Sequence, residues 1–322
     1  MFKILLALVG SLSVTFLNAQ TNTLLALNKA ENSLAIINAD TMKVIGRVPV
    51  GDGPHEVVFS ADGKLAFVSN YGAQVPGSSI SVIDVAQMKE LRRVDVSPLM
   101  RPHGLVMIGG KLYFTAEVNR LIGRYDPAAN KLDWLMGTGQ NGSHMIVVSQ
   151  DQKRMYTTNV GSDSITAFEF NAIPPAGSKV THIAVGKQPE AIDLSPDGKE
   201  VWVGLNIDAG VDIVNTSTMK VAERVKLASR PYRVRFSPDG KQVLFTLLAT
   251  KEIAIYDAAS RKELKKLTLD GVPMGVAFSP DGKTAFISIA EPDAVLKIDL
   301  EKMTISGSVE LVAPDGVAYF GK

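Results

Sequence analysis

One stretch decides the fold of this chain: Gly53-Pro54-His55-Glu56-Val57-Val58-Phe59-Ser60-Ala61-Asp62-Gly63-Lys64. It joins a segment of the form Pro-x-x-Φ-x-Φ, where Φ is apolar, to a tight turn. The segment occurs seven times, starting at Pro54, Pro102, Ser143, Pro189, Pro231, Pro273 and Pro314, with serine replacing proline in the third copy. Successive starts lie 48, 41, 46, 42, 42 and 41 residues apart. This period, with several short strands in each unit, is typical of a β-propeller.

Each unit continues with the same local elements. The turn, as in Ser195-Pro196-Asp197-Gly198-Lys199, combines a proline that presets φ with an Asp-Gly pair that accepts positive φ. A second apolar strand runs back over residues 65–70, and a third and a fourth follow over 79–84 and 92–96. Four antiparallel strands with short connections make one propeller blade. We therefore predict an all-β fold.

The two ends of the chain complete the count of blades. Residues 24–50 supply three strands with no Pro-x-x-Φ strand before them, whereas residues 314–319 supply an inner strand with nothing after it. We predict that the C-terminal strand joins the N-terminal three, which closes a seven-bladed ring and removes its open sheet edges. No linker or low-complexity stretch interrupts the repeats, so residues 20–322 are predicted to form a single domain.

Composition and the first residues indicate where the protein works. Lys3 and the apolar run over residues 4–17, followed by Leu17-Asn18-Ala19, predict a signal peptide over residues 1–19 and a periplasmic or secreted protein. A buried strand or an uncleaved anchor is the alternative, although the run is short for a membrane span. The chain has no cysteine for disulfides. The chain has 34 Lys and Arg against 33 Asp and Glu and no basic run, so we do not expect it to bind nucleic acid. We expect a monomer.

The repeat resembles the YVTN family of seven-bladed propellers. The resemblance rests on residues 53–64 and on Phe67-Val68-Ser69-Asn70-Tyr71, and it recurs with variation across nearly the whole mature chain. This family includes YncE-like periplasmic proteins and is related to 6-phosphogluconolactonase-like propellers. The resemblance implies the fold, but it does not fix an activity, because propellers host many unrelated functions.

Histidine gathers at one repeat position. The residue after each segment start reads His55, His103, His144, Glu190, Tyr232, Met274 and Asp315, so three of the four histidines occupy it. This position lies at the rim of the central channel, where side chains of consecutive blades can converge. Three imidazoles and a carboxylate are a suitable ligand set for a divalent metal ion. We predict a metal site of His55, His103, His144 and Glu190; the alternative is that each histidine caps its own strand through a backbone hydrogen bond.

A second repeat position is expected to return to the same rim. The sixth residue after the turn lysine is polar in the three histidine blades (Asn70, Glu117 and Asn159) and apolar in the next three (Leu205, Leu247 and Ile289). We predict that His103, Glu117 and Glu190 are catalytic acid or base groups. The predicted substrate-binding residues are Asn70, Arg101, Asn159, Arg230 and Tyr232. The two arginines would clamp an anionic group, with ordinary salt bridges as the alternative.

These residues lead to two hypotheses about function. The first is a metal-dependent hydrolase or lyase that acts on a small polar or anionic molecule in the central channel. The resemblance to lactonase propellers suggests a lactone or ester, and a sugar acid fits equally well. The second is a non-catalytic periplasmic scaffold that binds a ligand, a metal or a partner protein at the same rim.

Overall fold

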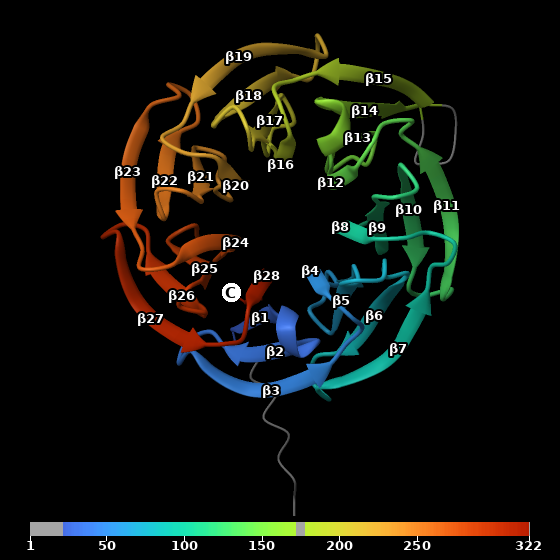
Figure 1. Cartoon of the computed structure of the whole chain (residues 1–322), viewed down its shortest axis with the longest axis vertical. Helices are drawn as coiled ribbons and strands as arrows, with labels where there is room; N and C mark the ends of the chain where they lie inside the picture. The colour runs from blue at the N-terminus through green and yellow to red at the C-terminus, as the bar shows by residue number, and fades with distance from the viewer. Residues whose placement is uncertain (1–21, 172–177, 322) are drawn as a thin grey trace, which may run out of the picture.

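Seven four-stranded antiparallel sheets form a ring in the computed structural model (Figure 1). The structure describes residues 22–171 and 178–321, so the predicted signal peptide lies outside the described residues. The innermost strands are β4 (Pro54–Phe59), β8 (Pro102–Ile108), β12 (Ser143–Val148), β16 (Pro189–Leu194), β20 (Pro231–Phe236), β24 (Val272–Phe278) and β28 (Pro314–Phe320). Each blade is named below by its innermost strand. The prediction of an all-β, seven-bladed propeller is confirmed.

The remaining strands follow in order from the axis to the circumference. The second strands are β1 (Thr23–Asn28), β5 (Leu65–Asn70), β9 (Lys111–Ala116), β13 (Arg154–Asn159), β17 (Glu200–Leu205), β21 (Gln242–Leu247) and β25 (Thr284–Ala290). The third strands are β2 (Ser33–Asn38), β6 (Ser79–Asp84), β10 (Leu121–Asp126), β14 (Ser164–Phe170), β18 (Gly210–Asn215), β22 (Glu252–Asp257) and β26 (Ala294–Asp299). The outer strands are β3 (Lys43–Pro49), β7 (Lys89–Asp95), β11 (Lys131–Gly137), β15 (Ser178–Ala184), β19 (Lys220–Lys226), β23 (Glu263–Thr268) and β27 (Thr304–Glu310).

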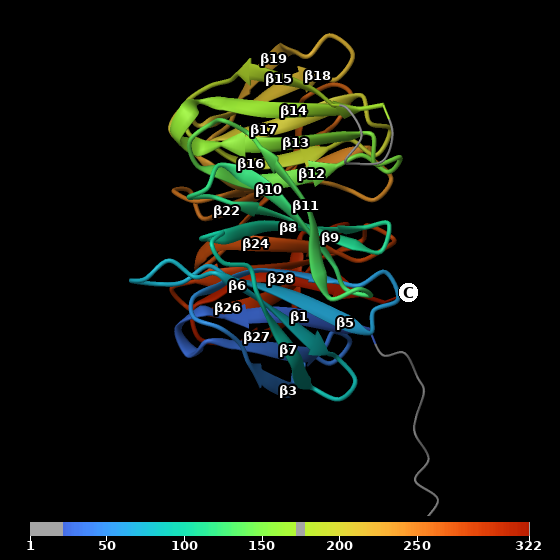
Figure 2. The same cartoon turned by 90° about the vertical axis from the view of Figure 1, so that its right-hand side faces the viewer.

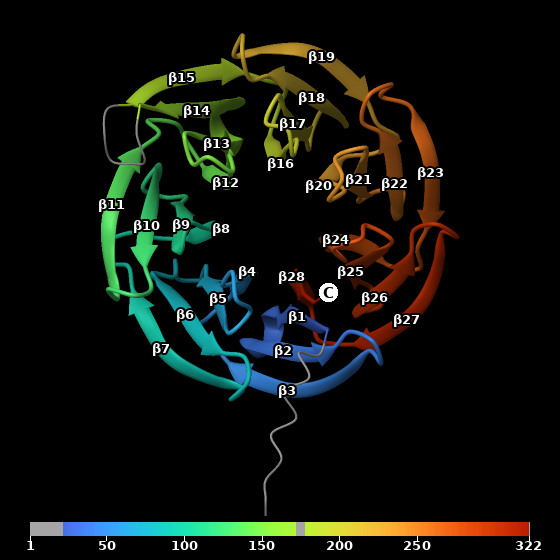
Figure 3. The same ribbon diagram turned by 180° about the vertical axis from the view of Figure 1, so that it is seen from behind.

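The ring closes where the two ends of the described chain meet. One sheet has the strand order β28-β1-β2-β3, and Leu25 of β1 pairs with Ala318 of β28. The view from behind shows β28 beside β1 and among the innermost strands (Figure 3). The prediction of a composite blade is therefore confirmed.

The hydrophobic core lies between neighbouring blades. Trp202 of the β16 blade packs against Phe236 and Phe245 of the β20 blade, for example. The second and third strands are almost wholly buried, whereas the outer strands consist mostly of exposed and half-buried residues. Figure 2 shows the ring of blades from the side. The only helices among the described residues are two short 3₁₀ turns, Lys29–Glu31 and Val160–Ser162. That part of the chain holds no helix long and apolar enough to cross a membrane.

Every innermost strand has an irregularity directly after the residue that starts its repeat segment. In β4 the pairing with β5 shifts by one residue between Pro54 and Val57, and the other six innermost strands show the same kind of shift. Such a bulge leaves one residue unpaired and redirects side chains, and bulges are frequent next to functional sites. Here it lies at the repeat position that carries the histidines.

Candidate functional site

The three histidines meet at the end of the ring where the innermost strands begin, called here the upper rim. The ring centroids of His55 and His103 lie 4.3 Å apart with an interplanar angle of 88°, and those of His103 and His144 lie 3.8 Å apart at 34°. His103 is fully buried, and the other two are nearly so. The sequence prediction that consecutive blades bring these side chains together is confirmed.

The close approach of the histidine strands depends on glycine. A Cβ atom on Gly104 would lie 2.8 Å from the carbonyl oxygen of His144, so only glycine lets β8 approach β12 to this distance. Gly316 stands in the same relation to the carbonyl oxygen of His55, at 2.6 Å. The structure thus explains why glycine follows the rim residue in these blades.

A second ring of side chains surrounds the histidines, and the sequence analysis found only one of its members. Pro102 pairs with Ala116, whereas Pro54 pairs with Asn70, so Glu117 lies one repeat position beyond Asn70. The turn of the β8 blade is shorter than that of the β4 blade. The sixth residue after the turn lysine is therefore not at the same strand position in the two blades. Counted from the strand pairing, the ring position reads Lys29, Tyr71, Glu117, Val160, Asn206, Leu248 and Ala290. Its four polar members all contact residues of the upper rim.

The structure places Asn70 and Asn159 away from the histidines. The Asn70 amide accepts a hydrogen bond from the backbone N–H of Gly51 at 3.0 Å and donates to Ser79 and Ser81. Asn159 donates to Ser164 and Thr166 in the same manner. Both amides thus connect strands of their own blade, so their polarity reflects local structure. Their predicted role in substrate binding gains no support from these contacts.

His144 is held between two carboxylates. Its Nδ1 lies 3.5 Å from Oε1 of Glu117, and its Nε2 lies 3.4 Å from Oε1 of Glu190. Burial opposes a charged imidazole, but the two carboxylates outweigh it and raise the pKa of His144 to about 9. In return, and against burial, His144 helps to lower the pKa of Glu190 to about 2. The two carboxylates therefore favour the charged form of His144 at neutral pH.

His103 has the opposite character. Burial, helped by the positive charge of His144, lowers the pKa of His103 well below its ordinary value. Neither ring nitrogen of His103 has a hydrogen-bond partner among the described residues, and the two ion-pair contacts of His144 are not aligned as hydrogen bonds. Buried polar groups are nearly always hydrogen-bonded. A neutral imidazole and a charged one thus lie in contact, both with unused hydrogen-bonding capacity.

The other side of the upper rim is a network around Asp315. Its carboxylate contacts Nδ1 of His55, accepts a hydrogen bond from Lys29 at 3.1 Å, and accepts another from the Tyr232 hydroxyl at 3.3 Å. Burial opposes ionisation, but His55 and Lys29 hold the pKa of Asp315 far below its usual range. Tyr232, predicted to bind substrate, here binds a carboxylate of the protein itself.

A buried ion pair crosses the channel next to these groups. Arg233 of β20 binds Glu56 of β4, and the β24 and β28 blades lie between these two strands around the ring (Figure 1). The guanidinium also lies 4.2 Å from the centroid of the Tyr232 ring. Its side chain is only 4% exposed, so the pair is desolvated. This contact was not predicted from the sequence, because the two residues belong to blades that are far apart in the chain.

Tyr71 and Arg101 lie beside the histidine stack. The Tyr71 ring lies 5.3 Å from that of His103, and its hydroxyl donates a hydrogen bond to Glu117. Burial and Glu117 raise the pKa of Tyr71 to about 12. Arg101, in a left-handed conformation with φ of 55°, places its guanidinium 4.4 Å from the centroid of the Tyr71 ring. Arg230 is exposed, and no side-chain contact brings it to the rim.

The predicted metal ligands do not form a ligand set in this arrangement. Among the described residues, no group of three or more His, Asp or Glu side chains is arranged to hold a metal ion. The His103 and His144 rings lie partly face to face, and His55 is engaged by Asp315. Glu190 contacts His144 and Asn206 instead. The metal site stays a prediction from the sequence.

Comparisons with known proteins agree with the fold. The model of the YNCE-like β-propeller family matches residues 110–279 and 171–310. None of the curated protein sequences compared with the chain matches it.

Solved structures show the same architecture at low sequence identity. A functionally unknown protein from Desulfotomaculum acetoxidans is 13% identical with a TM-score of 0.79, covering 93% of this chain and 99% of that one. A provisionally named 6-phosphogluconolactonase from Bacteroides fragilis is 14% identical with a TM-score of 0.77, covering 94% and 99%. Hydrazine synthase from Kuenenia stuttgartiensis is 21% identical with a TM-score of 0.70, covering 83% and 89%. At these identities the similarity establishes the fold alone.

Proposed function

This chain belongs to the YNCE-like β-propeller family, and from that starting point we propose that its upper rim is an acid–base site for a small polar substrate. One observation carries the proposal. Two buried imidazoles, 3.8 Å apart, have their pKa values shifted in opposite directions and keep unused hydrogen-bonding capacity. Neighbouring groups whose surroundings separate their pKa values are suited to be the acid and the base of one reaction.

The residues divide into two roles. Neutral His103 accepts a proton from water or from the substrate, and the imidazolium of His144 donates a proton to the oxygen on which charge develops. Glu117 and Glu190 act as positioning residues, because they keep His144 protonated. Access to the stack requires displacement of Tyr71 and Arg101, which lie beside it.

The substrate class follows from this chemistry. Hydrolysis of a lactone or ester needs a base for water and an acid for the leaving oxygen, and elimination from a sugar acid needs the same pair. The fold shared with a provisionally named lactonase makes lactones the first compounds to test. Export to the periplasm belongs to the same proposal and is tested by cell fractionation. The metal site predicted from the sequence is a separate proposal and is tested by elemental analysis.

The experiment is a screen of the purified protein against lactones, esters and uronate oligomers, followed by His103→Gln and His144→Gln. Each substitution is expected to lower kcat by about 10²–10⁴, the usual contribution of a general acid or base. His182→Gln is the control, because His182 lies exposed in outer strand β15. Activity should fall above about pH 9, as His144 loses its proton.

The non-catalytic scaffold of the second hypothesis predicts a different result. A ligand would then bind to the wild type and not to His103→Gln, with no turnover of any compound. Turnover that both histidine variants retain would contradict the acid–base proposal.

A further inference from the structure

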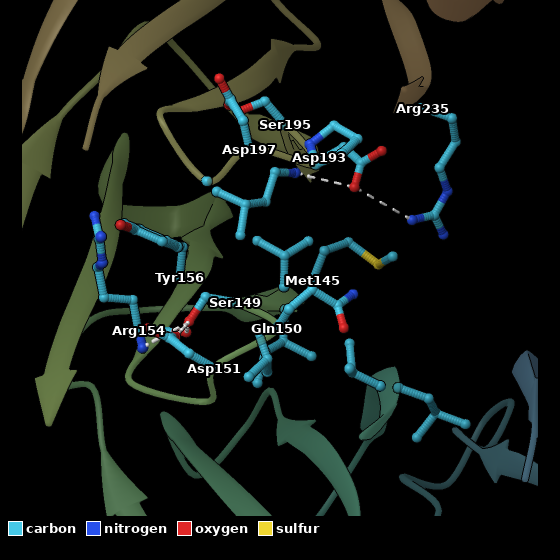
Figure 4. A pocket seen from close by; sticks show the side chains of 18 residues that line it. Met145, Ser149, Gln150, Asp151, Arg154, Tyr156, Asp193, Ser195, Asp197 and Arg235 are labelled. Carbon is cyan, nitrogen blue, oxygen red and sulfur yellow. Dashed lines mark hydrogen bonds and ion pairs between the residues drawn. The ribbon is translucent and has the colours of Figure 1, made fainter. Parts of the chain in front are cut away.

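A cavity of about 400 Å³ lies at the opposite end of the channel, where the innermost strands end (Figure 4). This end is called here the lower mouth. The cavity falls in the range of small-molecule sites, about 300–1,000 Å³. Its apolar wall comes from three innermost strands and includes Leu105, Val106, Met145, Ile146, Val148 and Leu194. None of its lining residues belongs to the upper rim.

Two charged residues flank this cavity at a repeat position that is otherwise apolar. The fourth residue after the segment start reads Val58, Val106, Val147, Asp193, Arg235, Ala277 and Ala318. Each of these residues pairs with a buried large side chain of the second strand, such as Trp202 opposite Asp193. Five blades therefore keep a small apolar residue here, and the two neighbouring blades β16 and β20 place an acid and a base. The fold does not need these charges, since five blades do without them.

The two charges are paired only weakly with each other. Nη1 of Arg235 lies 3.9 Å from Oδ1 of Asp193, beyond hydrogen-bond distance, and within the described residues the guanidinium has no other hydrogen bond or ion pair. Asp193 accepts hydrogen bonds from the backbone N–H groups of Phe236 at 2.8 Å and Leu194 at 3.0 Å. Burial nevertheless raises the pKa of Asp193, because these contacts compensate its desolvation incompletely.

We propose that the lower mouth binds a small zwitterion, an α-amino acid with an apolar side chain. Its ammonium group would donate to Asp193, its carboxylate would accept from Arg235, and its side chain would lie against Met145 and its apolar neighbours. Figure 4 shows Asp193 and Arg235 on one side of the pocket, joined by a dashed line, with Met145 nearby. A ligand with both charges forms an ion pair with Asp193 and with Arg235 at once. A ligand with a single charge leaves one of the two residues without a close ion-pair partner.

Isothermal titration calorimetry with four probes tests the chemistry of the ligand. L-leucine and L-methionine carry both charges, N-acetyl-leucine lacks the ammonium group, and leucinamide lacks the carboxylate. The two amino acids are expected to bind at least tenfold more tightly than either blocked compound. Equal binding of N-acetyl-leucine would show a simple anion site, and equal binding of leucinamide a simple cation site. Either result, or no binding of leucine and methionine, would overturn the proposal.

Variants test the location. The double substitution Asp193→Val/Arg235→Val installs the residue found in three other blades and removes both charges together, so the ring is expected to fold. It should abolish binding of leucine, while His103→Gln at the upper rim should leave it unchanged. If the double variant melts like the parent and still binds leucine with the same Kd, the site is elsewhere and the proposal fails. Binding lost in His103→Gln would place the ligand at the rim instead.

Discussion

The two ends of the channel are built from the same seven strands, yet they differ in how closely their charged side chains are paired. On the Asp315 side of the upper rim, ionised groups are buried together and satisfy one another, as in the Arg233–Glu56 pair and the contacts of Asp315. At the lower mouth, one pair of charges is separated by 3.9 Å and borders a cavity. The comparison indicates that charged repeat positions stabilise the ring at one end of a blade, whereas those at the other end are, under the proposal above, available to a ligand.

The bulge explains why the two ends differ. At the start of each innermost strand the extra residue breaks the regular pairing, and successive side chains such as His55 and Glu56 both make contacts across blades. By the fourth residue the pairing is regular again, so Asp193 and Arg235 each belong to an ordinary ladder. Contacts between distant blades therefore concentrate at the upper rim.

Removal of β28 should have the largest effect, because it breaks the ring itself. Truncation after Ala313 removes Asp315 and exposes the inner edge of β1 together with one face of each neighbouring blade. We expect loss of cooperative unfolding, measured by circular dichroism as a function of temperature. Truncation after Phe320 is the control and should melt like the parent. A cooperative transition at the parental temperature in the shorter variant would contradict the role given to β28.

Arg233→Met tests whether the upper rim carries stability. It leaves the Glu56 carboxylate buried without its partner, and such a loss typically costs about 3–5 kcal/mol in the free energy of unfolding. Urea unfolding followed by fluorescence measures the change.

Two controls decide what that change means. Glu56→Met/Arg233→Met removes both charges and should recover most of the stability, because apolar replacement of a buried pair is often close to neutral. Asp193→Val/Arg235→Val at the lower mouth should lower the free energy of unfolding by less than Arg233→Met does, since both charges are removed together and lie 3.9 Å apart. Equal losses in Arg233→Met and in the lower-mouth variant would remove the distinction between the two ends.

The smallest effect is a dependence on pH that only the upper rim should show. The folded pKa of His144 is about 9, above the ordinary value of 6.5, so the contribution of its positive charge is complete below pH 6.5 and is lost as pH rises through 9. Between these values the free energy of unfolding should fall by at most about 1.4 kcal/mol per pH unit.

His144→Gln is the matched variant for this measurement. It should flatten the pH dependence of the unfolding free energy between pH 6.5 and 9, and His182→Gln in outer strand β15 should leave it unchanged. The same slope in the wild type and in His144→Gln would show that His144 is not charged in the folded protein.

The fold could be predicted from the sequence because every blade repeats the same local sequence features. The segment starts, the Asp-Gly turns and the strand lengths are local features, and the unmatched strands at the two ends leave one way to close the ring. The turns behave as expected: Gly63, Gly198, Gly240 and Gly282 all have positive φ, and the serine before each turn binds the turn aspartate.

The site could be predicted only in part. Contact among the three histidines followed from one repeat position, but Tyr71, Lys29 and Asn206 were missed. The shorter turn of the β8 blade made Glu117 look equivalent to Asn70, so the position that Glu117 shares with these three residues was not recognised. Had the blades been aligned on the ends of their second strands, the ring of Lys29, Tyr71, Glu117 and Asn206 would have been visible.

Charge states at the rim were beyond the sequence. The sequence analysis treated the three imidazoles alike, as ligands of one metal ion. The structure gives His144 two carboxylate neighbours, whereas His103 is buried against the rings of His55, His144 and Tyr71, so their pKa values move apart. Such differences depend on which side chains of neighbouring blades come within a few ångströms, and repeat patterns do not specify this.

The pairing of β28 with β1 also determines when the first sheet can be completed during synthesis of the chain. During synthesis, Thr23–Pro49 is made first among the described strands and Pro314–Phe320 last, so the first sheet has to wait for its innermost member until nearly all the chain has been made. Until then β1 presents an unpaired edge, which is the kind of surface that associates with other chains. The edge of β1 therefore stays unpaired for longer than in a propeller whose blades are each made of contiguous strands.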